Sequence, residues 1–515
     1  MPFLEKQEKT LLKTLSDLAY CNLFSPSRVE FERQILGADF EEVGPVWSLD
    51  MDDPDRPLAN DWKVHKRVEG LVRSLRQRLD KSAKATREEL VLYEDAVLFV
   101  LYHRYVGAMT EAGFASGSEA VSTRRWRFYQ DYRRDWSQLL EVSGVSFPTN
   151  HEPAHTFACY FQIRRAFVNT FHHIVGSSPS VARLREAIWE SVFSHDVRRY
   201  RRTLYRRMGD FPTLITGPSG TGKELVARAI AFSRYLPFDE AKCEFKGMKG
   251  ELFYAVNLAA LPATLIESEV FGHRRGSFTG AVEDRKGWFE VCPSYGTVFL
   301  DEIGELEPEL QVKLLRVIET RSFQPVGETA ARTFAGKIVA ATNRDLGQAM
   351  AQGRFREDLY YRLCADQVST PSLRRQLEES PEVLDDLILF MARRVAGDEG
   401  ETLAKEVRAW VGQNLRAAYP WPGNYRELEQ CVRNILVHRR YEPRPQAADH
   451  GASGLLNQLR AGDMTAEQLL SAYATWVYHQ TGSYQETARR LEIDRRTVKS
   501  RVDVKLLEDF RESTN

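Results

Sequence analysis

The 515-residue sequence predicts an α/β domain with a parallel sheet, between a mainly helical N-terminal region and a small helical C-terminal unit. In the middle of the chain, short apolar and β-branched runs alternate with helical patterns, which is typical of a parallel sheet flanked by helices. A glycine-rich loop joins the first of these runs, residues 213–215, to a helix. At both ends of the chain the apolar residues recur with helical periodicity instead.

Composition sets limits on the class of protein. Hydrophobic residues make up 43% and charged residues 28% of the chain, which indicates globular domains rather than disorder. The net charge of −1 gives no sign of nucleic-acid binding, so any basic surface must be local. The six cysteines form no CxxC pair, which fits a reducing compartment. The charged N-terminus and the short apolar run at 96–101 predict a cytoplasmic protein with no membrane segment.

Residues 1–172 are expected to form a mainly helical domain. One helical face carries apolar side chains, namely Val64, Val68, Leu71, Val72, Leu75 and Leu79. Residues 123–140 interleave arginines with aromatic residues, a pattern that suits stacking on nucleic acid but more often marks a helix with an aromatic core face. His151 and His155 match the HExxH zinc pattern without an evident third ligand, so we interpret the match as coincidence. No sensor motif is evident, and the domain is expected to be regulatory or partner-binding.

Residues 211–224, FPTLITGPSGTGKE, predict a phosphate-binding loop. A buried strand enters a glycine-rich loop, and Lys223 opens a helix. The glycines let backbone N–H groups converge on an anion at the positive end of the helix, and Lys223 can reach the outer phosphates. Glu224 stands where Ser or Thr usually ligates magnesium, which is a departure from the general pattern.

Three further strands are expected at 255–257, 296–302 and 338–343. Asp301 ends the second of them and is placed to hold Mg²⁺ through water. Glu302 beside it is placed to polarise the water that attacks the γ-phosphate of ATP, and Asn343 to orient that water. Between the strands, Gly276 and Gly280 flank Phe278 and Thr279, which suggests a mobile loop tip with both side chains exposed.

The last 75 residues are expected to form a linker and a DNA-binding unit. Residues 441–464 are rich in Pro, Gly, Ala and Ser, which is typical of a linker. Helices are expected at 466–480, 484–492 and 495–504, and the last two form a helix-turn-helix. A plain basic helical hairpin is the alternative. The residues expected to contact double-stranded DNA are Arg495, Arg496, Thr497, Lys499, Ser500 and Arg501.

The motifs together resemble those of a known family. GPSGTGKE, AVNLAALP, ESEVFGHRRGSFTGA, GTVFLDEIGEL, AATNRDL, GRFREDLYYRL and WPGNYRELEQ occur in the order found in bacterial enhancer-binding proteins, which are AAA+ ATPases that activate sigma-54 RNA polymerase. The resemblance covers about residues 174–439, and Glu after the loop lysine is usual in that family. The C-terminal segment resembles the Fis-type domain that closes many of its members.

The resemblance implies roles for individual residues. Asp301 and Glu302 resemble the Walker B pair, with Asp301 on the metal, and Asn257 resembles the residue that holds the catalytic glutamate. Asn343 resembles sensor I, and Arg426 resembles sensor II from a helical lid. Arg356 and Arg362 resemble the arginines that reach a neighbouring subunit's γ-phosphate. The residues implied to bind nucleotide are Val175, Gly176, Gly217, Pro218, Ser219, Gly220, Thr221, Gly222, Lys223, Glu224 and Arg426. Those implied to contact the sigma factor are Gly276, Ser277, Phe278, Thr279, Gly280 and Ala281.

The whole sequence therefore predicts an ATP-hydrolysing transcription activator that assembles into a ring, usually a hexamer, and acts on sigma-54 RNA polymerase. The alternatives are an AAA+ module that acts on another target, and a DNA-binding repressor with a vestigial ATPase. The expected divisions are 1–172 (helical domain), 173–370 (AAA+ α/β domain), 371–440 (helical lid), 441–464 (linker) and 465–515 (helix-turn-helix). Residues 176–214 and 232–253 are longer than in the family, and we expect extra surface elements there.

Overall fold

A five-stranded parallel sheet lies at the centre of the α/β part, in the order β11-β1-β10-β7-β4. All of its neighbouring strands pair in parallel, so their carboxyl ends share one edge. The sequence predicted four of these strands and missed β11, whose DQVS sequence offers only Val368 to the core. The strands are β1 (Thr213–Thr216), β4 (Phe253–Asn257), β7 (Thr297–Asp301), β10 (Lys337–Thr342) and β11 (Asp366–Ser369).

The computed structural model describes residues 3–42, 59–81, 84–114, 126–149, 152–248, 250–416, 419–443, 464–503, 506–507 and 510. The chain divides into two compact units, Met1–Val437 and His438–Asn515. Among the helices of the described residues, none has the length and apolar character needed to cross a membrane.

Side chains of successive strand residues point to opposite faces of the sheet, and helices cover both faces. Leu214, Leu300 and Ala340 pack with α10, α12 and α14, whereas Ile215, Phe299 and Val339 pack with α7 and α9. Ser178 caps α7 by accepting a hydrogen bond from the Val181 N–H. The helices of this part are α7 (Pro179–Phe193), α8 (Val197–Arg202), α9 (Lys223–Phe232), α10 (Ala263–Phe271), α11 (Trp288–Val291), α12 (Pro308–Thr320), α13 (Leu346–Ala351) and α14 (Glu357–Leu363).

Short elements complete this part of the chain. Two small hairpins project from it, β5 (Gly272–His273) with β6 (Arg285–Lys286), and β8 (Ser322–Phe323) with β9 (Arg332–Thr333). The 3-10 turns are η4 (Leu204–Arg206), η5 (Met208–Asp210) and η6 (Ile303–Glu305). A helical lid follows the sheet, made of α15 (Leu373–Glu379), α16 (Val383–Ala396), η7 (Gly397–Glu399), α17 (Gly400–Asn414) and α18 (Asn424–His438).

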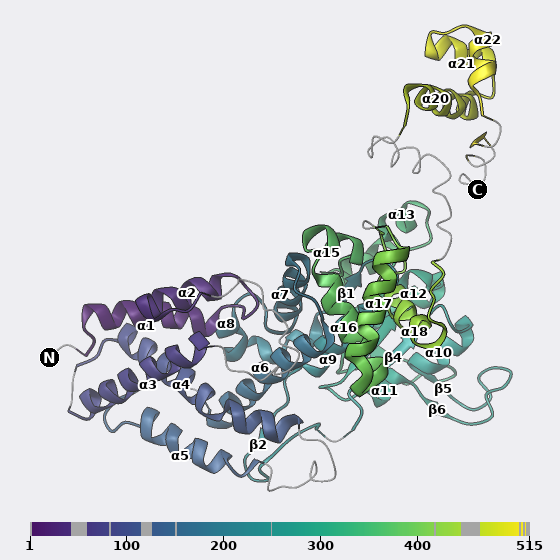
Figure 1. Cartoon of the computed structure of the whole chain (residues 1–515). Coiled ribbons are helices and arrows are strands. Elements are labelled where there is room, and N and C mark those ends of the chain that lie inside the picture. Colours follow the sequence, from purple (N-terminus) through teal and green to yellow (C-terminus); the bar gives the residue numbers. More distant parts are fainter. Residues whose placement is uncertain are drawn as a thin grey trace. The chain divides into compact units, whose positions relative to one another are not determined.

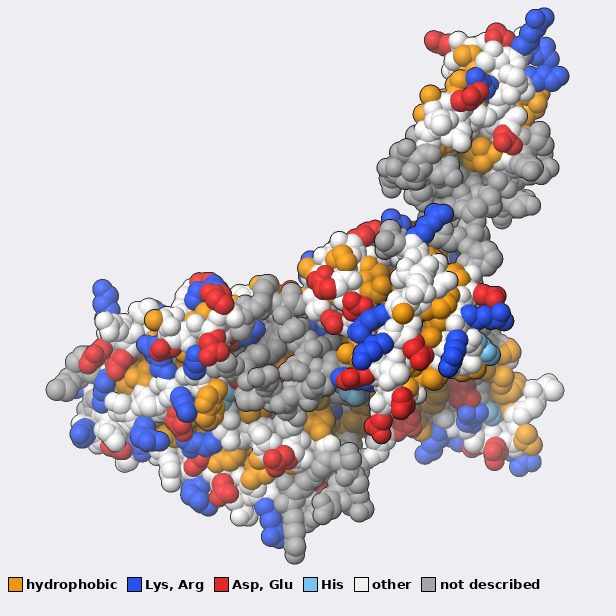
Figure 2. All heavy atoms as spheres, in the orientation of Figure 1, with side chains coloured by type: hydrophobic (Ala, Val, Ile, Leu, Met, Phe, Trp, Pro, Cys, Tyr) orange, Lys and Arg blue, Asp and Glu red, His pale blue; other side chains and the backbone are white. Residues whose placement is uncertain are grey.

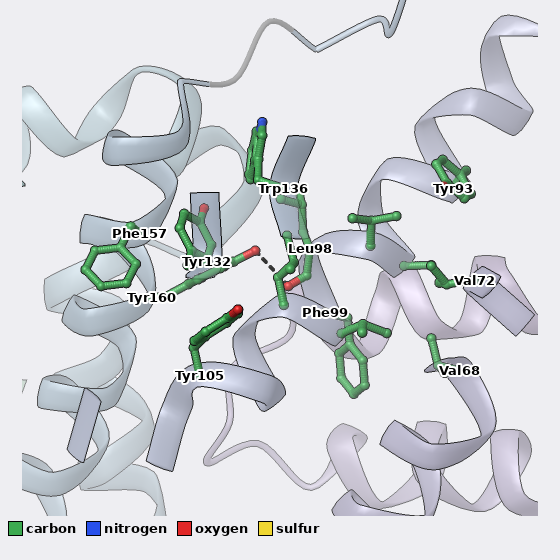
Figure 3. Packing of buried hydrophobic residues seen from close by; sticks show 14 of the residues in the cluster. Val68, Val72, Tyr93, Leu98, Phe99, Tyr105, Tyr132, Trp136, Phe157 and Tyr160 are labelled. Atoms are coloured by element: carbon green, nitrogen blue, oxygen red, sulfur yellow. Dashed lines mark hydrogen bonds between the residues drawn. The ribbon is translucent and has the colours of Figure 1, made fainter. Parts of the chain in front are cut away.

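The N-terminal block is helical, as predicted, and has its own aromatic core (Figure 3). Tyr132 and Phe157 lie in this core, and the Tyr160 hydroxyl donates a hydrogen bond to the Leu98 carbonyl at 2.7 Å. Trp126, Tyr129 and Trp136 are buried as well, which favours the core-face interpretation of this segment over stacking on nucleic acid. The helices are α1 (Lys6–Tyr20), α2 (Ser27–Leu36), η1 (Gly37–Asp39), α3 (Ala59–Asp80), α4 (Arg87–Phe114), α5 (Tyr129–Leu140) and α6 (Pro153–His173).

A hairpin from the α/β part enters that core. It consists of β2 (Phe238–Asp239) and β3 (Glu244–Phe245), and the Phe245 ring centroid lies 4.7 Å from that of Trp126. Phe238 and Phe245 are 8% and 4% exposed. The expectation that residues 232–253 form a surface element is therefore wrong for this hairpin, because its two phenylalanines pack among the N-terminal helices.

Helix α6 also contacts the end of α9 directly (Figure 1). Asn169 Nδ2 donates to the Phe232 carbonyl at 3.0 Å, Gln162 Nε2 to the Ser233 carbonyl at 3.0 Å, and Arg165 Nη1 to the Arg234 carbonyl at 3.1 Å. The carbonyls at the end of a helix have no hydrogen-bond donors within that helix. Side chains of α6 supply donors to the carbonyls of residues 232–234 here. The N-terminal block therefore caps the helix that begins at the phosphate loop.

The C-terminal unit consists of α20 (Ala466–Thr481), α21 (Tyr484–Leu491) and α22 (Arg495–Arg501). Glu492 adopts a left-handed conformation with φ of 53° in the turn after α21. Asp494 then caps α22 by accepting hydrogen bonds from the Arg496 and Thr497 N–H groups. Val498 is fully buried. These helices agree with the predicted helix-turn-helix.

Candidate functional site: the carboxyl edge of the sheet

The phosphate loop lies between β1 and α9, as predicted. Gly217, Gly220 and Gly222 have positive φ values of 147°, 78° and 87°. A Cβ on Gly217 would come within 2.7 Å of the Thr370 carbonyl oxygen, and one on Gly220 within 2.3 Å of the Gly423 carbonyl oxygen. Both positions therefore require glycine, because the end of β11 and the lid approach the loop backbone too closely for a side chain.

Lys223 begins α9 and folds back over the loop. Its Nζ donates to the Gly217 and Pro218 carbonyls at 3.2 and 3.3 Å. Burial lowers the pKa of Lys223, and the nearby carboxylates of Glu302 and Asp301 oppose that shift. A phosphate group beside this amine would stabilise its charged form, so the arrangement fits an anion at the start of α9.

The two acidic residues of the site stand at the end of β7. Asp301 ends β7, and burial followed by the charge of Glu302 raises its pKa. Asp301 Oδ1 accepts a hydrogen bond from the Glu302 N–H at 3.0 Å. Carboxylate oxygens are ligands that Mg²⁺ prefers, and this one lies near Lys223 where phosphates would be held. The donor set therefore fits the magnesium that the sequence predicts.

Glu302 has a left-handed backbone with φ of 54°, which is unusual for a non-glycine residue and often found at functional sites. Its Oε2 accepts a hydrogen bond from the Asn343 N–H at 3.3 Å, which joins the ends of β7 and β10. Asn257 is the register partner of Asp301 at the end of β4. Its Oδ1 accepts a hydrogen bond from the Ala259 N–H at 2.9 Å, and the side chain is exposed at this edge.

The lid contacts the phosphate loop through the start of α18. Arg426 Nη1 donates to Ser219 Oγ at 3.2 Å, so the predicted sensor II arginine lies at the loop. Asn424 Nδ2 donates to the Ser219 carbonyl at 2.9 Å, and its Oδ1 accepts a hydrogen bond from the Leu373 N–H at 2.8 Å. Asn424 thereby connects the loop with both α15 and α18.

Sequence reasoning missed two residues of this site. Asn424 belongs to the WPGNYRELEQ motif, in which the resemblance assigns a role only to Arg426, and its φ of 54° is a signal that only the structure reveals. Thr370 lies 149 positions after Thr221, yet their hydroxyl oxygens are 2.6 Å apart and both side chains are buried. Nothing in the local sequence around Thr370 marks it, because the contact depends on the pairing of β1 with β11.

Val175 and Gly176 lie before α7. The Gly176 carbonyl accepts a hydrogen bond from Arg185 Nη2 at 2.7 Å. Gly176 has a φ of 122° and faces Val181 and Gln376, which belong to α7 and the lid helix α15. Glu224, in the first turn of α9, forms an ion pair with Arg228 at 2.7 Å on the exposed side of that helix.

Arg356 precedes α14 and Arg362 lies in its last turn, and each has an acidic partner. Arg356 forms a bidentate pair with Asp358, at 3.0 and 2.7 Å, and Arg362 Nε donates to Glu319 at 3.0 Å. Their side chains are 46% and 60% exposed. Among the described residues, neither side chain forms a hydrogen bond or ion pair with the phosphate loop or the acidic pair, and both arginines lie at the surface.

The GSFTGA segment connects β5 and β6 and closes on itself. The Gly276 N–H donates to the Ala281 carbonyl at 2.9 Å, and the Ala281 N–H to the Phe278 carbonyl at 3.0 Å. Thr279 is exposed, as expected. Phe278 is not fully exposed, because its ring packs edge-on against His273 with centroids 4.9 Å apart.

Two neighbouring segments brace the base of the GSFTGA loop. Arg274 Nε donates to Glu328 at 2.9 Å, and its Nη1 donates to Asp284 at 2.6 Å. Ser277 packs against Gly327, whose φ is 78°. The base is therefore fixed to the β8–β9 connection while the tip faces solvent.

The predicted DNA contacts gather on one helix of the C-terminal unit. Figure 2 shows Lys and Arg side chains at the end of this unit that Figure 1 labels α21 and α22. Arg495, Arg496, Lys499 and Ser500 are exposed. Arg501 differs, because it forms an ion pair with Glu467 of α20 at 2.8 Å, and Thr497 bonds the capping Asp494.

The zinc-like pattern does not form a metal site within the described residues. His151 lies outside them. His155 uses both ring nitrogens, one with the Tyr235 hydroxyl at 2.8 Å and the other with the Arg201 carbonyl at 2.7 Å. No cluster of three or more metal-ligating side chains occurs in the part of the chain that the structure describes.

Comparison with known proteins agrees with this site. Residues 192–369 match the family model described as the sigma-54 interaction domain. These residues form a sigma-54 interaction domain. This domain is an AAA+ ATPase module, so ATP is the nucleotide expected at its phosphate loop.

Several curated proteins are similar to this chain over the same region. The Nif-specific regulatory protein of Azotobacter vinelandii is 42% identical over 225 residues, which are 44% of this chain and 39% of that protein. The hydrogenase transcriptional regulatory protein HoxA of Bradyrhizobium diazoefficiens is 41% identical over 236 residues, 45% of each chain. The regulatory protein LuxO of Vibrio vulnificus is 42% identical over 224 residues, 43% of this chain and 45% of that protein. The chain thus spans less than half the length of these relatives.

Among solved structures, NtrX from Brucella abortus is 23% identical, with a TM-score of 0.38, and the match covers 72% of this chain and 79% of that chain.

Proposed function

We propose that this protein is an ATP-driven transcription activator that remodels sigma-54 RNA polymerase. The observation that carries the proposal is the joint presence, in one sigma-54 interaction domain, of a phosphate loop with Lys223, an acidic pair at Asp301 and Glu302, and an outward GSFTGA loop.

The chemistry follows from what each side chain is placed to do. Lys223 and the loop N–H groups would bind the phosphates, and Asp301 would hold Mg²⁺, which would supply positive charge to the phosphate oxygens. Glu302, with its left-handed backbone and its bond to the Asn343 N–H, accepts a proton from the attacking water. Asn343 orients that water, and Asn257 holds Glu302 when its side chain turns away from Ala259.

Assembly completes the site. Arg356 and Arg362 are exposed and lie apart from the phosphate loop of their own chain. Arginines of this kind stabilise transition-state charge when a neighbouring subunit supplies them. The proposal therefore includes a ring, a hexamer by family resemblance, in which each Arg356 leaves Asp358 and contacts the nucleotide of the next subunit.

Transcription activation requires two further surfaces, one for the sigma factor and one for DNA. The exposed tip at Thr279, with Phe278 beside it, would contact the sigma factor. The basic start of α22 would bind double-stranded DNA upstream of the promoter, with Arg495, Arg496 and Lys499 facing the major groove. Binding upstream raises the effective concentration of the activator at the promoter.

The test is Glu302→Gln, with Glu309→Gln on the exposed first turn of α12 as the matched control. ATP hydrolysis and open-complex formation are measured with sigma-54 RNA polymerase on linear promoter DNA. Micromolar activator is used, since high concentration replaces upstream tethering. Glu302→Gln should retain ATP binding and lose about 10²- to 10⁴-fold in hydrolysis and open complexes, whereas Glu309→Gln should behave as wild type.

The outcomes separate the alternatives. Near-normal hydrolysis in Glu302→Gln would contradict the assignment of the base. Hydrolysis by the wild type without open complexes would favour an AAA+ module that acts on another target. Absence of hydrolysis in the wild type, together with DNA binding, would favour a repressor with a vestigial ATPase.

A further inference from the structure

A cavity of about 490 Å³ lies at the opposite edge of the sheet, where the N-terminal block meets the α/β part. Its walls come from α6, from the connection after α8, from the segment after α9 and from the residues before β7 and β10. Its lining residues include His155, Tyr205, Arg234, Tyr235 and Lys337. Among these residues, only His155 belongs to a pattern that the sequence analysis singles out, the zinc-like match.

A buried lysine and a partly buried arginine line the cavity. Lys337 is 3% exposed, and its Nζ donates to the Phe211 carbonyl at 2.8 Å and to the Met208 carbonyl at 3.5 Å. Arg234 donates to the Ser294 carbonyl at 2.9 Å and to the Gly296 carbonyl. Burial lowers the pKa of Lys337 to about 8 and that of Arg234 to about 10. Desolvated cations of this kind are costly unless an anion compensates them.

The acidic groups near the cavity have other partners. Asp210 lies 3.6 Å from Arg207 and 3.7 Å from Arg321. Asp366 accepts hydrogen bonds from Ser191 and from Thr213, the latter at 2.6 Å. Glu152 is exposed. Asp210 and Glu152 line the cavity as well. Among the described residues, however, neither Lys337 nor Arg234 has a carboxylate within ion-pair distance, so both cations can pair with an anionic ligand.

Aromatic rings form the other wall. The Tyr205 ring lies 4.1 Å from the His155 ring and 4.8 Å from the Tyr235 ring, measured between centroids. His155 is fixed by hydrogen bonds from both sides, and its pKa is lowered by burial, so it presents a neutral ring. A wall of fixed rings favours a flat ligand that stacks on them.

The cavity touches the far ends of the two elements that carry the nucleotide site. Helix α9 begins at Lys223 of the phosphate loop, and Arg234 follows its last turn. Strand β10 begins at Lys337, and Asn343 follows its last residue. A ligand that draws Arg234 and Lys337 away from their carbonyl partners therefore acts on both elements at once.

From these observations we propose that the cavity is an effector site for a small aromatic anion, a flat ring that bears a carboxylate or a phosphate. The anionic group pairs with Lys337 and Arg234, and the ring stacks against Tyr205. The volume lies within the usual range for small-molecule sites, about 300–1,000 Å³. Occupancy is transmitted along α9 and β10 to the phosphate loop; this second part rests on the proposed ATP site.

Binding is tested by calorimetric titration of the full-length protein with benzoate and with phenyl phosphate, which distinguishes the two anionic groups. Benzyl alcohol is the neutral probe of the same size. One of the two anions should bind with a Kd below about 1 mM, and benzyl alcohol at least about tenfold more weakly, because a charge-assisted contact is lost. Lys337→Met should weaken the binding at least about tenfold. Lys286→Met, on an exposed position of β6, is the matched control and should leave it unchanged.

Tyr205→Leu removes one ring of the aromatic wall and does not change a residue of the sheet. It therefore tests the proposal even if Lys337→Met fails to fold. Lys223→Ala should bind the anion as the wild type does, because the phosphate loop is a different site. Absence of binding by both anions at millimolar concentration would overturn the proposal. Binding that survives both Lys337→Met and Tyr205→Leu, or that Lys223→Ala abolishes, would overturn it as well.

Coupling is tested by titrating ADP with and without the bound anion. Allosteric coupling changes both affinities by the same factor, typically about 5- to 150-fold, and we expect a change in that range. An unchanged ADP affinity beside demonstrated anion binding would contradict the transmission along α9 and β10. Failure of the wild-type protein to bind ADP at all would contradict the proposed function instead, while the anion titration would still stand.

Discussion

The two edges of the central sheet differ in how their residues come together. At the carboxyl edge, Asp301 ends β7, Asn343 directly follows β10, and Lys223 follows the loop after β1. Each residue is tied to the end of a strand, so short motifs specify the site. At the amino edge, Arg234 and Lys337 meet His155 of the N-terminal block around a cavity. Both edges bury charged groups, but the carboxyl edge combines acids with a lysine, whereas the amino edge has cations that bond carbonyl groups.

This difference shows why one edge is readable from sequence and the other is not. Backbone geometry at the phosphate loop demands glycine at Gly217 and Gly220, and such demands leave a fixed spacing in the sequence. The cavity at the amino edge needs only side chains of suitable charge and shape. These side chains come from elements far apart in the chain, so no local spacing records them.

The largest expected effect tests whether the proposed ATP site at the carboxyl edge needs a residue from a neighbouring subunit. Arg356→Ala should reduce ATP hydrolysis about 10³-fold or more, because an arginine from a neighbouring subunit stabilises the transition state. Arg374→Ala, an exposed lid arginine paired with Glu378, is the control and should change the rate little. Steady-state hydrolysis is the measurement.

Mixing Arg356→Ala with Lys223→Ala sharpens this test. Hybrid interfaces can combine an intact phosphate loop from one chain with an intact arginine from the other, so activity should return. A failure to recover activity, once mixed oligomers have been demonstrated, would show that Arg356 acts within its own chain or only supports the fold.

A smaller effect tests how strongly the β2–β3 hairpin is held in the core of the N-terminal block. Phe245→Ala removes a ring that is 4% exposed in the N-terminal core, and should lower the free energy of unfolding of that part by about 3–5 kcal/mol. Phe211→Ala removes a ring that is 46% exposed, and should change it by no more than about 0.5 kcal/mol. Urea midpoints followed by tryptophan fluorescence measure the difference. Equal midpoints would mean that the hairpin is not held in that core in solution.

The smallest effect concerns pH at the junction of α6 and α9. Burial, reinforced by His172 and Arg228, lowers the pKa of His173 to about 4, and its ring stacks on Phe232. The unfolded chain then binds a proton more readily than the folded chain between the folded pKa and the ordinary value of about 6.5, so stability falls as pH decreases through this window.

His173→Gln should therefore flatten the fall in stability between about pH 6.5 and 4. His438→Gln, at an exposed position of α18, is the control and should leave the slope as in the wild type. Thermal midpoints across this pH range provide the measurement. An unchanged slope in His173→Gln would show that this histidine is not buried at the junction.

Much of the fold follows from the sequence because its signals are local. Apolar periodicity predicted the N-terminal helices, and the capping box of Thr86 with Glu89 is present at the start of α4. Strand β11 was missed because an edge strand with a single buried residue carries little periodic signal. The β2–β3 hairpin was misplaced at the surface because its burial depends on Trp126, more than a hundred residues earlier.

The candidate site shows the same contrast. The sequence predicts Lys223, Asp301 and Glu302 from their places after short apolar strands and from the family resemblance. It does not predict Thr370 and Asn424, since their contacts with Thr221 and Ser219 arise from strand pairing and from lid closure over the loop. Phe278 is predicted to be exposed, but its ring packs on His273, and this contact depends on the fold of the β5–β6 connection.

The most direct test of the proposed function separates the motor from its output. Thr279 is exposed at the loop tip, and the loop base is fixed by Arg274. A residue that contacts only the sigma factor contributes to coupling and not to phosphate chemistry. Thr329→Ala, at an exposed position of the neighbouring β8–β9 connection, is the matched control.

The decisive measurement is open-complex formation by Thr279→Ala at a sigma-54 promoter, with ATP hydrolysis followed in the same reactions. The account predicts hydrolysis within a few-fold of the wild type and no open complexes, while Thr329→Ala forms them normally. Full open-complex formation by Thr279→Ala would contradict the assignment of this loop as the polymerase contact, and loss of hydrolysis would place Thr279 in the structure of the motor instead.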